Sequence, residues 1–197
     1  LPGFVERSKV IASLPSLGLL TLASHTPENW NVVYKELDNY TDQEIEEIEN
    51  EKPDIIAFSS LTARINETYT LTTRFKKSGI KVVIGGLHVS AMPDEAMKFA
   101  DSIIQGEGEV IWSKLLVDFE NNNLKPLYSS LTQKDNIFHL HQAKVPSYEL
   151  LDISKYNRLT IQTTRGCPLH CSFCASSRTI STYKKKPIEL VEKELNK

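Results

Sequence analysis

Apolar and polar positions change their pattern repeatedly between residue 17 and about residue 122. Short apolar runs predict buried strands, because parallel strands that are covered on both faces are apolar throughout. Longer amphipathic or apolar segments between these runs predict helices. We expect strands at Trp30–Leu37, Asp54–Ser60, Lys81–Ile84 and Ser102–Ile104, and helices at Leu17–His25, Asp42–Glu51, Asn66–Ser78, Pro93–Ala100 and Val110–Glu120.

The alternation of strands and helices defines the expected fold class. Strands that are separated by helices form βαβ units and a parallel sheet. We therefore predict an α/β domain with a doubly wound parallel sheet of the flavodoxin or Rossmann type. Four strands make a thin sheet, and residues 1–16 contain no convincing strand to extend it. We interpret the chain as a fragment that has lost an N-terminal strand.

The rest of the chain divides into two further segments. Prolines and scattered polar residues make 126–156 a connector between a first domain, 1–125, and a final segment, 157–197. The final segment is expected to contain a strand at Arg158–Thr163 and a helix at Lys186–Lys197. This helix has three apolar residues on one face, at positions i, i+3 and i+7: Ile188, Val191 and Leu195.

Composition and charge exclude several classes of protein. The 197 residues include 23 basic and 25 acidic residues, a net charge of −2, which makes no general case for binding nucleic acid. No apolar run reaches the ~20 residues that span a bilayer, and no signal peptide opens the chain. We expect a cytoplasmic protein that acts on a small molecule. The chain starts at Leu1 and stops at Lys197 inside a predicted helix, so we expect it to be cut at both ends.

Three cysteines lie within eight residues, in the pattern C-x3-C-x2-C: Cys167, Cys171 and Cys174. An odd number of cysteines at this spacing does not form a disulfide framework. Pro168 disfavours a regular helix through the loop, and Gly166 allows the backbone to turn tightly. The three thiolates are therefore expected to converge on one soft metal centre.

Two kinds of metal centre fit three cysteines. A [4Fe-4S] cluster needs four ligands, so three thiolates would leave one iron open to a small molecule. The alternative is zinc held by the three cysteines and by His170 or another histidine. Structural zinc sites usually combine two paired knuckles, and this sequence contains no second knuckle.

The cysteine loop resembles the signature of the radical SAM superfamily. The resemblance rests on the three cysteines, on Phe173 just before the last of them, and on the Arg165-Gly166 lead-in after a predicted strand. It implies a [4Fe-4S] cluster whose open iron is chelated by S-adenosylmethionine, with Phe173 near the adenine. It also implies the first strand, cluster loop and helix of a βα barrel, and a low-potential electron donor such as flavodoxin or ferredoxin.

The first ~125 residues resemble the cobalamin-binding domain that precedes the barrel in one radical SAM subfamily. The resemblance rests on short Gly-, Ser- and Thr-rich segments that begin where apolar strands end, at the edge where open α/β sheets bind ligands. Taken singly, these segments are also compatible with ordinary turns, and His88 with a packing residue. The implied cofactor contacts are Ser59, Ser60, Thr62, Gly85, Gly86, His88, Gly106, Glu107 and Gly108.

One departure from the cobalamin pattern concerns the lower cobalt ligand. Domains that ligate cobalt through histidine carry D-x-H-x-x-G. If Gly18 takes the glycine position, Ser13 and Pro15 occupy the Asp and His positions. We therefore expect cobalamin to bind without a histidine from this motif, or the domain to have kept the fold and lost the cofactor.

The combined resemblance implies a cobalamin-dependent radical SAM enzyme that transfers a methyl group to an unactivated carbon. Leu17–Glu120 also resembles the corresponding segment of anaerobic porphyrin-ring cyclases and hopanoid methylases. The alternatives are a radical SAM oxidative cyclase or rearrangement enzyme with a vestigial cobalamin domain, and a non-catalytic α/β module with a zinc-stapled tail. We expect this chain alone to be inactive. The three lysines at 184–186 are interpreted as a solvated loop.

Overall fold

A computed structural model describes residues 14–37, 40–131, 137–156, 158–169, 171–174 and 183–197. Ser13 and His170, which were considered above as possible ligand positions, lie outside these ranges. No helix in the described ranges is long and apolar enough to cross a membrane.

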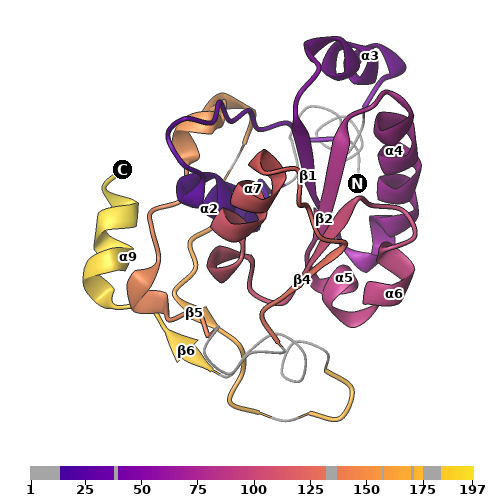
Figure 1. Cartoon of the computed structure of the whole chain (residues 1–197). Helices are drawn as coiled ribbons and strands as arrows, with labels where there is room; N and C mark the ends of the chain where they lie inside the picture. The colour runs from indigo at the N-terminus through magenta and orange to yellow at the C-terminus, as the bar shows by residue number, and fades with distance from the viewer. Residues whose placement is uncertain (1–13, 38–39, 132–136, 157, 170, 175–182) are drawn as a thin grey trace, which may run out of the picture.

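A four-stranded parallel sheet forms the centre of the structure (Figure 1). Its strands are β1 (Ile55–Ser59), β2 (Lys81–Gly85), β3 (Ser102–Gln105) and β4 (Leu127–Ser129). They lie in the order β1-β2-β3-β4, and each pair of neighbours is parallel. The predicted α/β class with a parallel sheet is confirmed.

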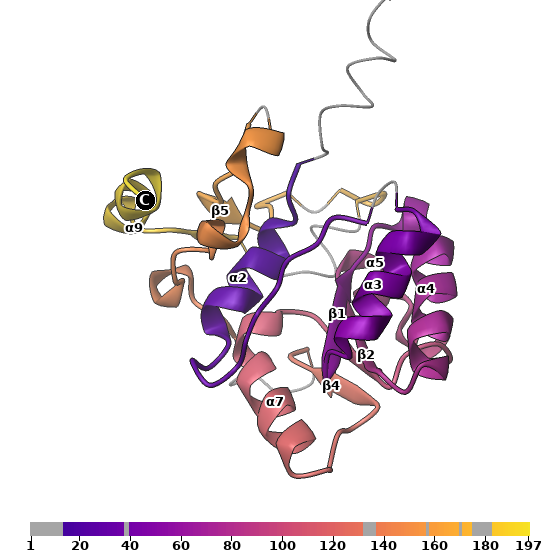
Figure 2. The ribbon, with the colours of Figure 1, turned by 90° about the horizontal axis from the view of Figure 1, so that it is seen from above.

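Helices cover both faces of this sheet, as Figure 2 shows. One face packs against α3 (Asp42–Glu51), α4 (Ile65–Lys77), α5 (Leu87–Ala91) and α6 (Pro93–Ala96). The other face packs against α2 (Leu17–His25) and α7 (Trp112–Glu120). The sheet is therefore doubly wound, and helix packing on both sides explains why its strands are apolar.

Successive strand residues supply the two halves of the core. In β2, Val82 and Ile84 pack with α3–α6, while Val83 between them packs with α7. In β3, Ile103 packs with α3–α6 and Ile104 packs with α7. This division follows from the strand period of two, which points neighbouring side chains to opposite faces.

Local signals mark several helix ends as expected. Thr41 and Glu44 form a capping box at the start of α3. Gly79 has φ +82° just after α4, the left-handed conformation that commonly follows a helix. Pro93 occupies the first turn of α6. The predicted helix over 93–100 is too long, however, because α6 ends at Ala96, and α5 was not predicted.

The prediction of a strand at Trp30–Leu37 is wrong. Residues 31–37 are neither helical nor paired in a sheet, and exposed and half-buried positions alternate along them. The segment leads from α2 on one face of the sheet toward α3 on the other. The alternating pattern correctly indicates one-sided burial, but a strand also needs a neighbouring strand to pair with.

The fourth strand of the sheet comes instead from the segment predicted as a connector. Residues 127–129 form β4, which pairs with β3 through Ile103–Leu127, Ile104–Tyr128 and Gln105–Ser129. The predicted domain boundary at residue 125 therefore precedes the last strand of the sheet. Three short 3-10 turns follow in the same segment, at Leu140–Gln142, Tyr148–Leu150 and Ile153–Lys155.

The final segment forms a two-stranded ladder and a helix. Strands β5 (Thr164–Arg165) and β6 (Lys184–Lys185) pair antiparallel, and α9 spans Ile188–Leu195. The strand predicted at Arg158–Thr163 is wrong, because only Thr164 and Arg165 enter the ladder. Figures 1 and 2 show α9 on the α2 side of the molecule, away from α3 and α4.

Candidate functional site

The carboxyl edge of the sheet brings together the residues that follow β1 and β2. Ser59 ends β1, Gly85 ends β2, and these two residues are partners in the parallel register. Gly86 has φ +105°, and a Cβ placed on it would lie 3.2 Å from the carbonyl oxygen of Ser60. The backbone after β2 therefore passes very close to the backbone after β1, where only glycine fits.

Large apolar side chains are exposed along this same edge. Leu61 follows β1, Leu87 follows β2 and Leu131 follows β4, and all three are exposed. Exposed apolar side chains that gather at one place often mark a ligand or partner surface. The edge thus offers polar backbone and hydroxyl groups of Ser59 and Thr62 beside apolar side chains.

His88 is buried beside this edge and contacts protein groups through both ring nitrogens. Its Nδ1 lies 3.3 Å from Oγ1 of Thr62, and its Nε2 lies 3.3 Å from Oε1 of Glu95. The ring also packs edge-on against Tyr69. In this arrangement His88 joins the turn after β1 to α6, and a cofactor contact from it would have to replace one of these partners.

The glycines after β3 contact protein side chains. The Gly106 amide donates to Oγ of Ser90 at 2.9 Å, and a Cβ on Gly106 would lie 2.3 Å from Oγ of Ser130. A Cβ on Gly108 would lie 3.1 Å from the side chain of Leu22 in α2. Both glycines are therefore explained by close packing within the protein, whatever else contacts them.

The Glu107 carboxylate is buried and receives several hydrogen bonds. The Lys184 ammonium donates to both carboxylate oxygens at 2.8 Å, and Arg165 Nη1 donates to Oε1 at 3.1 Å. The Phe138 amide donates to Oε2 at 3.1 Å. Glu107 was predicted as a cofactor contact, but in this structure its carboxylate is bound by groups from the C-terminal part of the chain.

Glu109 and Gln162 complete the surroundings of Arg165. Arg165 Nη2 donates to Glu109 Oε1 and, at 2.9 Å, to Gln162 Oε1, and the guanidinium lies over the Phe138 ring at 5.4 Å. Burial opposes the charge on Arg165, but the hydrogen bonds and negative charges of Glu109 and Glu107 raise its pKa above the ordinary value. Glu107 was predicted as a cofactor contact and Arg165 as part of the lead-in to the cysteines, and the pairing of their two segments was not predicted.

The cysteine loop begins directly after Arg165. Cys167, Cys171 and Cys174 are half-exposed, the Leu169 amide lies 3.4 Å from Sγ of Cys167, and the Cys174 amide donates to the Cys171 carbonyl at 3.2 Å. Phe173 is 90% exposed. Within the described ranges, no three Cys, His, Asp or Glu side chains gather closely enough to hold a metal ion. The donor set suits a soft metal, but its three sulfurs are not gathered into a ligand set in this structure.

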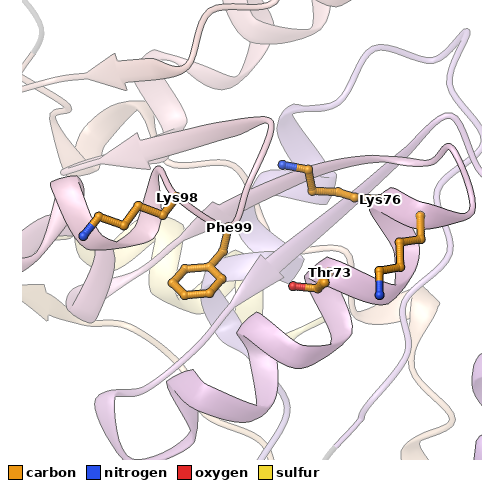
Figure 3. A pocket seen from close by; sticks show the side chains of 5 residues that line it. Thr73, Lys76, Lys98 and Phe99 are labelled. Atoms are coloured by element: carbon orange, nitrogen blue, oxygen red, sulfur yellow. The ribbon is translucent and has the colours of Figure 1, made fainter.

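A hollow of about 290 Å³ lies at the opposite end of the sheet (Figure 3). It is lined by Thr73, Lys76 and Lys77 near the end of α4 and by Lys98 and Phe99 just before β3. These segments lead into the amino ends of β2 and β3. None of the predicted cofactor residues lines this hollow, so it is separate from the carboxyl edge.

The fold is an open α/β domain, and domains of this class usually bind ligands beyond the carboxyl ends of their parallel strands. The sequence profile of the B12 binding domain matches residues 7–116 of the chain. The chain belongs to the B12-binding domain family.

Several curated proteins are similar in sequence. The chain is 37% identical over 131 residues to bacteriochlorophyllide d C-8(2)-methyltransferase of Chlorobaculum tepidum, covering 62% of this chain and 28% of that protein. It is 31% identical over 152 residues to the C-12(1)-methyltransferase of the same organism, covering 72% and 32%. It is 26% identical over 168 residues to hopanoid C-2 methylase of Rhodopseudomonas palustris, covering 84% and 31%. The chain thus spans about a third of the length of these relatives.

Proposed function

We propose that the protein binds cobalamin at the carboxyl edge of its sheet and a [4Fe-4S] cluster on Cys167, Cys171 and Cys174. On this proposal the chain is part of a radical SAM enzyme that transfers a methyl group to an unactivated carbon of a small molecule. Membership of the B12-binding family and the names of the similar methyltransferases support the cobalamin and transferase parts of the proposal.

The observation that carries the proposal is the geometry of the carboxyl edge. Gly86 removes side-chain bulk where two strand ends meet, and Leu61 and Leu87 are exposed next to it. A corrin ring is broad and largely apolar on its faces, so it needs an open backbone edge beside apolar side chains. Ser59 and Thr62 have hydroxyl groups that suit the amide side chains of the ring.

The cobalt is proposed to have no protein histidine as its lower ligand. Pro15 is buried just before α2, and its ring nitrogen is part of the backbone and cannot coordinate a metal. His88 is held by Thr62 and Glu95. The D-x-H-x-x-G positions of this chain would therefore supply no histidine to cobalamin bound at the edge.

The cluster is proposed from the chemistry of its donors. Three thiols in one short loop provide three of the four ligands that a [4Fe-4S] cluster needs, which leaves one iron for S-adenosylmethionine. When bound, the cluster would supply the electron that cleaves S-adenosylmethionine, from a donor such as flavodoxin or ferredoxin. The cluster's own contribution is the redox chemistry, and the chain holds and orients it.

Titration of the full chain with hydroxocobalamin tests the proposal. We expect one equivalent to bind, and cob(II)alamin electron paramagnetic resonance to show no coupling to a protein nitrogen. Leu87→Asp should weaken binding at least ~10-fold, because it removes apolar area and places a charge at the edge. Val117→Asp, at an exposed position on α7, is the matched control and should bind as the parent chain does.

Two outcomes contradict the proposal. A protein nitrogen on the cobalt would overturn the assignment of the lower face. A folded chain that does not bind cobalamin would favour the alternative of a domain that has kept the fold and lost the cofactor.

A further inference from the structure

Four charged side chains connect the carboxyl edge of the sheet to the two ends of the cysteine loop. Glu107 and Glu109 lie in the loop that follows β3, Arg165 lies in β5 before the cysteines, and Lys184 lies in β6 after them. None of the four side chains is more than 15% exposed. The two glutamates are far in sequence from Arg165 and Lys184, and together the four side chains form a buried cluster that we call the ionic link.

The ionic link is balanced in charge and closely bonded. Arg165 donates to Glu107 through Nη1 and to Glu109 through Nη2. Lys184 donates to both oxygens of Glu107 and, at 2.6 Å, to the Phe138 carbonyl. Two negative and two positive groups neutralise one another. Because a buried charge is costly when it loses its partner, removing one carboxylate should destabilise the whole arrangement.

The backbone near Glu107 is itself held in place. The Glu107 amide donates to Oγ of Ser130 at 2.7 Å, just after β4, and the Gly106 amide donates to Ser90. The carboxylate is therefore presented from a segment that is anchored to the end of the sheet. A preorganised acceptor of this kind can fix the position of a flexible partner.

The link holds both ends of the loop that carries the cysteines. Arg165 precedes Cys167 by two residues, and β5 pairs with β6 through Thr164–Lys185 and Arg165–Lys184. The Lys186 amide also donates to the Thr163 carbonyl at 2.8 Å. A ladder this short has few hydrogen bonds of its own, so its attachment to the sheet domain depends on the ionic link.

We propose that Glu107 and Glu109 are positioning residues that fix the cysteine loop against the carboxyl edge, so that a cofactor on the loop faces a cofactor on the edge. The identity of the two cofactors rests on the proposed function, whereas the mechanical link rests on the contacts of this chain alone. Neither glutamate acts on a reacting atom. Both act through Arg165 and Lys184.

Hydrogen exchange of the full chain without cofactors tests the link directly. In Glu107→Gln, the Lys186 amide and the β5–β6 ladder should exchange at least tenfold faster than in the parent chain, while β1–β3 keep their protection. Glu149→Gln is the matched control, because Glu149 makes an exposed ion pair with Lys197 near the same end of the chain. The control should leave the ladder unchanged.

A paired substitution separates the link from a general loss of stability. Glu107→Gln leaves Lys184 buried without its carboxylate, whereas Glu107→Gln with Lys184→Met restores the charge balance. The double variant should recover overall stability, because no buried charge is left unpaired, but its ladder should still exchange faster than in the parent chain, because the contact between residues 107 and 184 is lost. Equal exchange of the ladder in the parent chain and Glu107→Gln, or parent-like protection of the ladder in the double variant, would overturn the proposal.

The distance between the two bound cofactors distinguishes a positioning role from a purely structural one. With iron, sulfide and cobalamin bound and reduced, pulsed electron paramagnetic resonance should give a narrow cluster–cobalt distance in the parent chain and a broad one in Glu107→Gln at equal metal content. An unchanged distance in the variant would overturn the positioning role. A chain that takes up neither cofactor contradicts the proposed function, and the exchange experiment still decides the link.

Discussion

Gly86 is a position on the carboxyl edge where a side chain is poorly tolerated. Its backbone, with φ 105° and ψ −176°, lies in a region that only glycine occupies readily, and a Cβ would meet the Ser60 carbonyl at 3.2 Å. Gly86→Ala should lower the free energy of unfolding by about 1–3 kcal/mol, as measured by urea denaturation.

Gly18→Ala is the matched control for this substitution. Gly18 lies in α2 with open space around it, so alanine should raise the free energy of unfolding by up to ~1 kcal/mol through helix propensity. If Gly86→Ala were as stable as the parent chain, the close approach of the two strand ends would be contradicted.

His25 gives the fold a predictable dependence on pH. Burial and the charge of Lys144 lower its pKa below 6.5, although Glu109 acts in the opposite direction, and its Nε2 has no hydrogen-bond partner among the described residues. Below about pH 6.5 the unfolded chain binds a proton that the folded chain resists. The free energy of unfolding should therefore fall as the pH drops from 7 to 5.

Denaturation at several pH values checks this expectation. In His25→Gln the unfolded chain no longer gains that proton, so the slope of stability against pH between 7 and 5 should be smaller than in the parent chain. An identical slope in the two proteins would show that His25 ionises equally in the folded and unfolded states.

At the scale of single residues, local motifs of the site could be predicted from the sequence, whereas contacts between distant residues could not. The cysteine spacing and the glycines after the strands are local patterns, and they could be recognised directly. The interpretation of the three lysines at 184–186 as a solvated loop is wrong, because Lys184 pairs with Glu107 and Lys186 with Glu194 in buried contacts. The partners lie 77 and 8 residues away, and a run of like charge carries no information about either.

Whole elements were predictable where their patterns were long or strongly apolar. The pattern identified β1, β2, β3, α3, α4 and α7 within a few residues of their observed ends. It missed β4, because a three-residue strand at the edge of a sheet has too few positions to show a period. It also assigned a strand to Trp30–Leu37, because one-sided burial resembles a strand even when no neighbouring strand is present.

The helix α9 shows how an amphipathic pattern can be misleading at the element scale. Two of its large apolar residues, Ile188 and Leu195, are 63% and 66% exposed, while Glu194 is buried. Glu194 accepts from the Tyr148 hydroxyl at 2.7 Å and from Lys186. The helix is thus attached by a charged residue, whereas these two apolar side chains are largely exposed.

Glu194→Ala should release α9 from the rest of the chain. The substitution leaves Lys186 buried without its partner, which should cost about 3–5 kcal/mol of stability. Glu192→Ala, on the exposed side of the same helix, should cost less than ~0.5 kcal/mol. Urea denaturation followed by exchange at residues 188–195 measures both effects.

A paired substitution again supplies the deciding comparison. Lys186→Met with Glu194→Leu removes both charges and should be at least as stable as either single variant. If Glu194→Ala and Glu192→Ala had equal effects, the buried ion pair would not be what attaches α9.

At the scale of the whole molecule, the candidate site is made of two distant parts of the sequence. Residues 59–62 and 85–88 form the carboxyl edge, and residues 166–169 and 171–174 belong to the cysteine loop. Each part was recognisable from its own motif. Their connection through Glu107 and Glu109 was not, because it depends on how the chain after β4 folds back onto the end of the sheet.

The metal content of the loaded chain shows whether it binds both a [4Fe-4S] cluster and cobalamin. The full chain is incubated without oxygen with iron, sulfide, zinc and hydroxocobalamin, separated from unbound material, and analysed for each element. We predict about four irons, about four sulfides and about one cobalt per chain, with the iron lost in Cys171→Ala and the cobalt retained. One zinc per chain in place of iron, or no cobalt on a folded chain, would contradict this prediction.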